Sequence, residues 1–292
     1  MQDYLVRSYS PVGLYPVDSF FHKNAMLFIS NEIIFSIVKI ERKIHFTEDT
    51  LWLLPEEIQL CSAINLSVPP MNFGKTIFYP NMPGYTLELE RNSLNNKNLE
   101  NIVMPFIKKK MNTRKDFPFD YTVLPQFISN MDYQFNYKAK NKKRQLQLFN
   151  AINLENKMLI RGLDTLLKSN VLFRHPQFLV EACSLLHISM EVSFHLVCDK
   201  ANINHLKQKS KVKKAQEYLC TALDERYEGQ KYFEPFYEDR IKIVHPKNNF
   251  GIFAQPPISL DDFYQLYDNL IAVYSFLLIG YKKLMWESNW DY

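Results

Sequence analysis

The sequence predicts an α+β protein, with a mixed, strand-containing N-terminal region of unknown role at residues 1–150 and an all-α helical bundle at residues 151–292. Two observations predict this class. Short runs of β-favouring residues separated by turn signals dominate the first half, whereas apolar residues recur at helical spacing in the second. A length of 292 residues and an apolar fraction of 47% are enough to build one large core or two medium ones.

The expected strands of the N-terminal region are short and rich in β-branched and aromatic residues. The sequence Pro-Asn-Met-Pro-Gly at residues 80–84 predicts a hairpin-like turn before the last of them. A polar, asparagine-rich stretch at residues 91–100 then leads into a helical or irregular segment. The expected strands are residues 25–30, 33–40, 43–46, 76–79 and 85–89.

Two basic clusters follow the expected strands. The first consists of Lys108, Lys109, Lys110, Arg114 and Lys115. The second follows three aromatic residues closely, so it could track a phosphate backbone while the aromatic rings stack on bases. A solvated connecting segment is the alternative interpretation. The candidate RNA-binding residues of this second cluster are Lys138, Lys140, Lys142, Lys143 and Arg144.

Helical periodicity begins after residue 150 and predicts five helices. Pro176 suits the first turn of the second helix. Pro246 ends the fourth, because proline disfavours the α conformation in the residue before it. The fifth opens with a capping-box variant formed by Ser259 and Asp262. The expected helices are residues 154–169, 176–199, 211–223, 235–244 and 259–280.

The second expected helix carries one polar stripe on an otherwise apolar surface. At 100° per residue, the members of this stripe fall within about 120° of one another. Either the stripe faces solvent, or Glu181 or Glu191 anchors an arginine in a functional site. The stripe consists of Glu181, Ser184, His187, Glu191 and His195.

An arginine and a histidine separated by four residues stand at the end of the fourth expected helix. A guanidinium can hold a phosphate bidentately, and a neutral imidazole can take a proton from a hydroxyl near pH 7. Arg240 and His245 are about 140° apart on a regular helix, so His245 must lie where the helix unwinds before Pro246 if both are to reach one ligand. The alternative is a structural role, in which Arg240 pairs with Glu191 or Glu181 and His245 caps a helix C-terminus.

The expected helices and the Arg-x4-His motif resemble the HEPN family (higher eukaryotes and prokaryotes nucleotide-binding domain), and more closely uncharacterised bacterial HEPN-like proteins. The resemblance spans about residues 150–283. It rests on Leu159-Ile160-Arg161-Gly162-Leu163, Leu167-Lys168-Ser169, Arg240 to His245-Pro246, Phe250-Gly251 and Asp261-Asp262-Phe263-Tyr264. It implies a metal-independent endoribonuclease, often a dimer with facing motifs and often part of phage defence or toxin systems.

The resemblance assigns phosphate binding to Arg240 and proton transfer to His245, as the ribose 2′-hydroxyl attacks the adjacent phosphorus. His245 or its symmetry mate would protonate the leaving group. Catalytic members commonly carry Asn, Asp or His directly after the arginine, where this chain has Ile241; Asp239 and Lys242 are the nearby polar residues that could substitute. A non-catalytic dimerisation or partner-binding module is therefore the alternative function.

The expected partners are RNA and further copies of the chain, as a homodimer or a higher homo-oligomer, with a phage-derived or nucleotide trigger. No metal or cofactor is expected, because the four cysteines are scattered without a Cys-x-x-Cys pair. A cytoplasmic protein without a membrane partner is expected, because no basic segment followed by an apolar one opens the chain and the apolar stretch at residues 270–279 is too short to span a bilayer. An apolar face at residues 178–197 would serve the alternative module.

Overall fold

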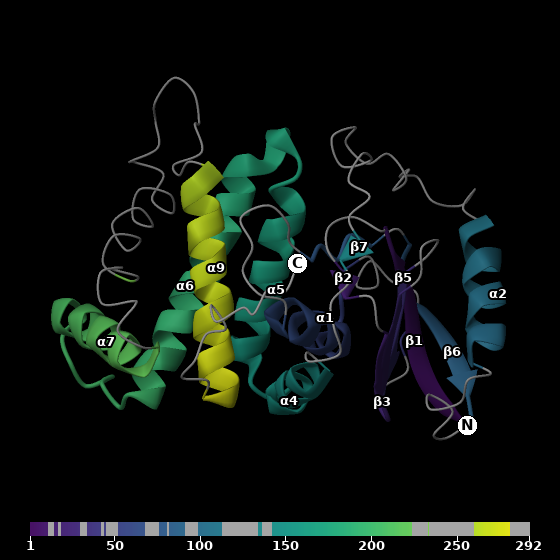
Figure 1. The fold of residues 1–292 in the computed structure, drawn as a ribbon, viewed down its shortest axis with the longest axis horizontal. Helices are drawn as coiled ribbons and strands as arrows, with labels where there is room; N and C mark the ends of the chain where they lie inside the picture. The colour runs from purple at the N-terminus through teal and green to yellow at the C-terminus, as the bar shows by residue number, and fades with distance from the viewer. Residues whose placement is uncertain are drawn as a thin grey trace. The chain divides into compact units, whose positions relative to one another are not determined.

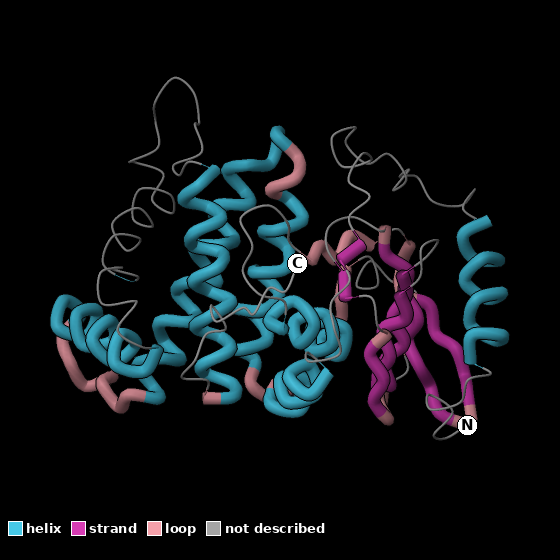
Figure 2. The backbone as a smooth tube through the Cα atoms, viewed as in Figure 1, coloured by secondary structure: helices cyan, strands magenta, loops and turns pink. Residues whose placement is uncertain are grey.

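The computed structural model describes residues 1–10, 15–16, 19–29, 34–41, 44, 52–67, 76–80, 82–90, 99–112, 134–135, 142–223, 233 and 260–280. The chain divides into two compact units, with the boundary between Phe149 and Asn150 (Figure 1). Strands and helices make up the described part of the first unit, and helices that of the second (Figure 2). The α+β class with a helical C-terminal region is thus confirmed.

A five-stranded antiparallel sheet in the order β3-β4-β5-β1-β6 forms the centre of the first unit. β1 lies inside the sheet, because it pairs with β5 on one side and with β6 on the other. A separate parallel pair joins β2 (Tyr15–Pro16) to β7 (Gln134–Phe135). The strands of the large sheet are β1 (Gln2–Tyr9), β3 (Phe20–His22), β4 (Ala25–Ile29), β5 (Ile34–Lys39) and β6 (Tyr85–Leu89).

Helices lie against the two faces of this sheet (Figure 1). Side chains alternate along β1, so neighbouring residues belong to different cores. Tyr4 joins an apolar cluster with residues of α2 (Leu99–Asn112). Arg7 and Tyr9 point to the other face and contact α1 (Pro55–Ser67) through its polar groups. Both cores depend on the same strand.

Three predicted strands correspond to β4, β5 and β6, with ends that differ by at most one residue. β1 was not predicted, because Arg7 interrupts its apolar run with a charge that is nevertheless 0% exposed. α1 was not predicted either, although Pro55 and the acidic Glu56 and Glu57 are typical of a first helical turn.

The predicted strand at residues 76–79 is wrong. Its carbonyl groups accept hydrogen bonds from elsewhere: the Tyr15 hydroxyl donates to Ile77 O, and Ser10 N–H donates to Tyr79 O at 2.9 Å. The turn that follows leads into β6, whose sheet partner is β1, so it closes no hairpin. Of the predicted strand at residues 43–46, only residue 44 is described, and it has no strand geometry.

Long helices build the described part of the second unit. α6 packs against α5, α7 and α9, and Figure 1 shows α5, α6 and α9 side by side. The predicted helices at residues 154–169, 176–199, 211–223 and 259–280 correspond to these helices, whereas the predicted helix at residues 235–244 lies outside the described residues. The observed bounds are α5 (Lys157–Leu172), α6 (Leu179–Lys200), α7 (Gln208–Leu223) and α9 (Leu260–Ile279).

Local signals explain where these helices begin. The Asn156 side chain accepts a hydrogen bond from Leu159 N–H at 3.0 Å, so α5 starts after this N-cap instead of at residue 154. Pro176 opens a single 3-10 turn, Pro176–Phe178, directly before α6. α4 (Lys142–Ala151) precedes the helical unit and packs on the first one, where the ring of Phe149 contacts Phe20.

Gly162 lets α5, α6 and α9 approach one another closely. A β-carbon at this position would collide with the Tyr274 hydroxyl of α9 and lie 2.6 Å from Val192 Cγ1 of α6. The glycine carbonyl accepts a hydrogen bond from Ser189 Oγ at 2.8 Å, and the Tyr274 hydroxyl donates to Ser189 O at 2.9 Å. Small residues and neutral hydrogen bonds thus hold the helical core together.

α6 has 22 residues and enough apolar character to cross a lipid bilayer by length and composition alone. Within its most apolar window, 56% of the residues are buried inside the protein, a property shared by the core helices of soluble proteins. Its apolar face, predicted at residues 178–197, packs against α5 and α9.

Candidate functional site

The predicted catalytic pair, Arg240 and His245, lies outside the described residues, as do Asp239 and Lys242. The described residues nearest to them in the sequence are Phe233 on one side and the start of α9 on the other.

Phe233 fixes this part of the chain to the helical unit. The side chain is 2% exposed, and its ring lies edge-on to Phe194 of α6 with a centroid distance of 5.1 Å. Its backbone N–H donates a hydrogen bond to Gln216 Oε1 of α7 at 2.8 Å. Phe233 thus contacts α6 and α7 together, and it holds the chain beside the C-terminal half of α6.

An imidazole and a carboxylate lie on the outer surface of α6 next to this anchor. His195 Nε2 is 3.9 Å from Glu191 Oε1, and the two side chains are 47% and 36% exposed. The His195 ring is 5.6 Å from that of Phe194, which contacts Phe233. Glu181 is also exposed but lies ten residues before Glu191, about 15 Å along the helix axis. Of the two predicted supporting carboxylates, Glu191 lies nearer to the anchor.

The polar stripe predicted on α6 is interrupted at His187. This side chain is 0% exposed, and its Nδ1–H donates a hydrogen bond to Cys183 O at 2.8 Å. The prediction is wrong for this residue because α6 is covered on several sides by other helices of the unit. His187 belongs to the core and cannot meet a ligand at the surface.

Three candidate RNA-binding residues are described, and they fall in the first turn of α4. Lys142 and Lys143 are exposed, whereas Arg144 is half-buried and donates a hydrogen bond to Leu66 O at 3.4 Å. Lys138 and Lys140 lie outside the described residues. The described part of this cluster thus presents two lysines to solvent, and its arginine contacts the carbonyl of a neighbouring helix.

A third basic cluster lies around the N-terminal half of α7. It was not among the binding residues predicted from the sequence. We call it the α7 ridge; it consists of Lys207, Lys209, Lys211, Lys213 and Lys214. Four of the five side chains are exposed, and Lys211 is half-buried. The signal was present in the sequence as five lysines in eight residues, but the helix was expected to begin only at Lys211.

The electrostatics of the α7 ridge are unfavourable for an isolated helix. Lysines near a helix N-terminus oppose the helix dipole, and no acidic residue lies in the first turn. Lys209 and Lys213 are four residues apart, a spacing at which like charges destabilise a helix by about 0.2–0.5 kcal/mol. Lys214 Nζ lies 2.8 Å from Glu217 Oε2 and forms an ion pair with it.

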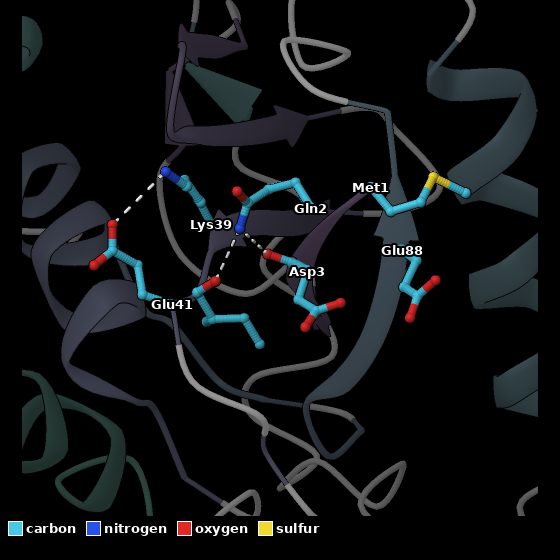
Figure 3. Close-up of a pocket in the computed structure, with 7 residues that line it drawn as sticks. Met1, Gln2, Asp3, Lys39, Glu41 and Glu88 are labelled. Atoms are coloured by element: carbon cyan, nitrogen blue, oxygen red, sulfur yellow. Dashed lines mark hydrogen bonds and ion pairs between the residues drawn. The ribbon is translucent and has the colours of Figure 1, made fainter.

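A hollow of 480 Å³ in the first unit is lined mainly by acidic side chains, so its charge is opposite to that of the α7 ridge (Figure 3). It carries the carboxylates of Asp3, Glu41 and Glu88, with Lys39 Nζ 3.7 Å from Glu41 Oε1. The Gln2 side chain also lines the hollow and donates a hydrogen bond to Ile40 O at 3.1 Å. Three carboxylates against one lysine repel a polyanion, so this hollow is not a site for RNA.

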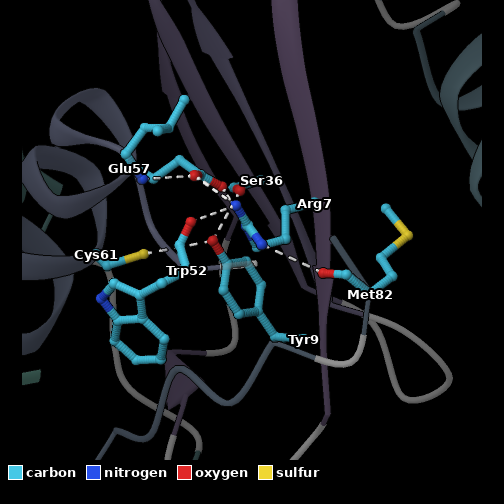
Figure 4. A network of polar contacts seen from close by, with 8 residues as sticks. Arg7, Tyr9, Ser36, Trp52, Glu57, Cys61 and Met82 are labelled. Carbon is cyan, nitrogen blue, oxygen red and sulfur yellow. Dashed lines mark hydrogen bonds and ion pairs between the residues drawn. The ribbon is translucent and has the colours of Figure 1, made fainter. Parts of the chain in front are cut away.

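A buried ion pair joins β1 to α1 in the first unit (Figure 4). Arg7 and Glu57 are 0% exposed and form two hydrogen bonds, of 2.6 Å from Nε and 3.0 Å from Nη2. Arg7 also donates to Trp52 O at 2.7 Å and Met82 O at 3.3 Å, and Glu57 accepts from Leu54 N–H at 2.9 Å. Desolvation, the largest single cause, lowers the pKa of Arg7, but the charge and hydrogen bonds of Glu57 together with smaller effects of Tyr9 and Cys61 raise it overall.

Tyr9 and Cys61 complete this network. The Tyr9 hydroxyl shares a hydrogen bond of 2.9 Å with Ser36 Oγ and lies 3.6 Å from Cys61 Sγ (Figure 4). Burial raises the pKa of the Tyr9 hydroxyl and that of the Cys61 thiol well above their ordinary values. Both groups are therefore neutral near pH 7 and inaccessible to substrate. The network holds the sheet to α1.

Comparison of the chain with protein-family models, with curated proteins and with solved structures gave no match. Within the described ranges, no three or more His, Cys, Asp or Glu side chains gather in a way that could hold a metal ion.

Proposed function

We propose that the protein is a metal-independent endoribonuclease whose active site is formed by Arg240 and His245 in the helical unit. The arginine binds the scissile phosphate bidentately. The histidine takes the proton of the ribose 2′-hydroxyl, whose oxygen attacks the adjacent phosphorus. The bond to the 5′-oxygen breaks, the leaving oxygen receives a proton, and the products carry a 2′,3′-cyclic phosphate and a 5′-hydroxyl.

The Phe233 anchor is the observation that carries this proposal. Arg240 follows Phe233 by seven positions, a distance of about 10 Å in a helix and at most about 25 Å in an extended chain. Because Phe233 packs on Phe194, this length of chain starts beside the exposed Glu191 and His195. Phe233, the described residue that precedes the predicted motif most closely in the sequence, thus lies beside accessible polar groups, which supports the proposal.

Glu191 supports the proposed site in a defined way. An exposed carboxylate near Phe233 could orient the Arg240 guanidinium, as expected from the sequence, and it already faces His195 at 3.9 Å. A carboxylate that orients an arginine fixes the direction in which the guanidinium presents its donors. Glu191 is therefore proposed as a positioning residue, and Asp239 and Lys242 as polar neighbours of the motif.

The alternative, a non-catalytic module that docks a partner through the apolar face at residues 178–197, has less support. This face packs against α5 and α9 within the helical unit, so the feature that motivated it is accounted for by the core. Ile241, in place of the usual polar residue, is the remaining argument for the module. The homodimer, the phage-defence or toxin role, the trigger and the cytoplasmic location stay predictions.

Cleavage of a labelled RNA by the purified protein in the presence of EDTA tests the proposal. We expect 5′-hydroxyl and cyclic-phosphate ends, and we expect His245→Ala and Arg240→Ala to abolish cleavage. His205→Ala is the matched control, since His205 is an exposed histidine between α6 and α7 that the mechanism does not use. Cleavage by His245→Ala at the wild-type rate would refute the assignment.

A further inference from the structure

The α7 ridge is a patch of like charge whose orientation is fixed by the core. α7 packs on α6 and α9 with one apolar stripe, so its lysines are distributed over the remaining, solvent-facing surface. Lys207 to Lys214 span about 10 Å along the chain axis at the helical rise. The buried stripe of α7 consists of Val212, Ala215, Leu219 and Leu223.

The fold itself makes little use of these lysines. Glu217 is the acidic residue of α7; it forms an ion pair with Lys214, and the charge of Lys213 also lowers its pKa. Lys200 in the same unit shows how a structural lysine differs: its Nζ donates to the carbonyls of Phe276 and Leu277 near the end of α9, at 3.2 and 3.1 Å. Among the described residues, the lysines of the α7 ridge make no comparable contacts with backbone carbonyls, so this part of the fold does not account for their charge concentration.

We propose that the α7 ridge binds the phosphate backbone of RNA and delivers the strand to the ribonuclease site, an inference that rests on the proposed function. Gln216, which holds Phe233 in place, lies one helical turn after Lys213 on the same helix. The α7 ridge and the contact that holds Phe233 therefore belong to the same helix. RNA fits because its phosphates supply a row of negative charges and need no specific side-chain geometry.

A membrane surface fits the ridge less well. Helices that lie on a bilayer combine their lysines with exposed large apolar residues that enter the acyl region. The large apolar residues of α7, such as Val212, Leu219 and Leu223, are instead buried in the helical unit. The ridge offers charge without an insertion surface, which favours a flexible polyanion over a lipid headgroup layer.

Fluorescence anisotropy with a labelled single-stranded RNA tests this inference, using full-length protein with His245→Ala so that the RNA stays intact. We expect Lys209→Gln/Lys213→Gln to weaken binding several-fold and to reduce the slope of log Kd against log salt by about 1.4, from two lost contacts at about 0.7 each. Lys108→Gln/Lys109→Gln on α2 removes the same charge from two exposed lysines and is expected to leave binding unchanged.

Three results would overturn the inference. The first is unchanged RNA affinity both in Lys209→Gln/Lys213→Gln and in a second pair, Lys207→Gln/Lys214→Gln. The second is an equal loss in the α2 control, which would show a net-charge effect only. The third is a loss of binding to phosphatidylserine vesicles with RNA affinity intact. Failure of the proposed function would give a different result, which is RNA cleavage by the His245→Ala protein in the separate cleavage assay.

Discussion

The two units use charge in opposite ways. The first buries the ion pair between Arg7 and Glu57 completely, so no ligand reaches it. In the described part of the second, the buried polar groups are hydroxyls, amides and one histidine, while the lysines of the α7 ridge lie outside. A buried charge is tolerated only where partners compensate its desolvation, whereas an exposed run of one sign is available to a ligand. The difference indicates that a polyanion would bind at the α7 ridge of the second unit and not at the buried ion pair of the first.

The largest expected effect comes from removing one half of the buried pair. Arg7→Met leaves the Glu57 carboxylate buried without its partner, and we expect the first unit to lose about 3–5 kcal/mol of unfolding free energy. Hydrogen exchange monitored by mass spectrometry separates the units: protection should fall in β1 and α1 and stay unchanged in α5 and α6.

Two variants sharpen this result. Arg7→Met/Glu57→Met removes both charges and should recover much of the stability, because no unpaired charge remains. Arg161→Met removes an exposed arginine from α5 and should change stability by less than about 0.5 kcal/mol. If Arg7→Met were as mild as Arg161→Met, the contrast between the two units would disappear.

The second expected effect concerns the neutral core of the helical unit. Gly162→Ala inserts a methyl group against Tyr274 and Val192, and we expect it to destabilise this unit by about 1–3 kcal/mol. Urea denaturation followed by circular dichroism measures the change. Tyr274→Phe removes the hydroxyl that the methyl group meets, so Gly162→Ala should cost less in that background. Equal costs in both backgrounds would mean that the helices separate to relieve the contact.

Alkaline pH probes the buried thiols of the helical unit. Burial raises the pKa of Cys183 and of Cys198 from the ordinary value of 9.0 to about 11. A raised folded-state pKa gives stability that is complete below pH 9 and is lost as the pH rises toward 11, since the unfolded chain releases the proton first. We expect a loss of about 1 kcal/mol per thiol between pH 8 and pH 10.

The slope of unfolding free energy against pH provides the measurement for these thiols. Cys183→Ala and Cys198→Ala should each flatten the slope between pH 9 and pH 11, whatever their effect on stability at pH 7. Cys220→Ala serves as the comparison, because this side chain is only half-buried. A slope that is the same in all four proteins would contradict the burial argument.

The smallest expected effect has the opposite sign. Lys209→Gln removes a like-charge pair with Lys213, and we expect it to stabilise the helical unit by about 0.2–0.5 kcal/mol at low salt. Lys168→Gln should destabilise by a similar amount, because Lys168 pairs with Asp164 at 2.8 Å. Thermal unfolding at 20 mM and 500 mM salt should show both differences shrinking as salt screens the charges. A destabilising Lys209→Gln would give the ridge a structural role.

Periodicity predicted the helical unit better than the sheet. α5 and α7 each bury a stripe of apolar residues, and α6 and α9 are long apolar helices that are buried on several sides, so either pattern is visible within one window of sequence. β1 carries Arg7 on a buried face, and its place in the sheet depends on Glu57, fifty residues away. No local pattern encodes such a partner, which explains why an interior strand escaped prediction.

The candidate site was predictable in part. The sequence placed Glu191 and His195 on one helix face, and the structure shows them 3.9 Å apart and accessible. It also placed His187 there, but burial depends on which helices cover α6, and this is decided by tertiary packing. The role of Phe233 was not predictable, because a single phenylalanine carries no sign that it packs between two helices.

The pairing of β1 has a consequence for the order of folding. Gln2 pairs with Leu89, and Tyr4 with Lys39, so β1 can pair only after strands that are synthesised later in the chain. α5 and α6, in contrast, are consecutive and meet through a short connection. Distant pairing slows folding because the loop must close before the contacts form. The helical unit, although synthesised after the first unit, is therefore expected to fold quickly, and the sheet is expected to set the overall folding time.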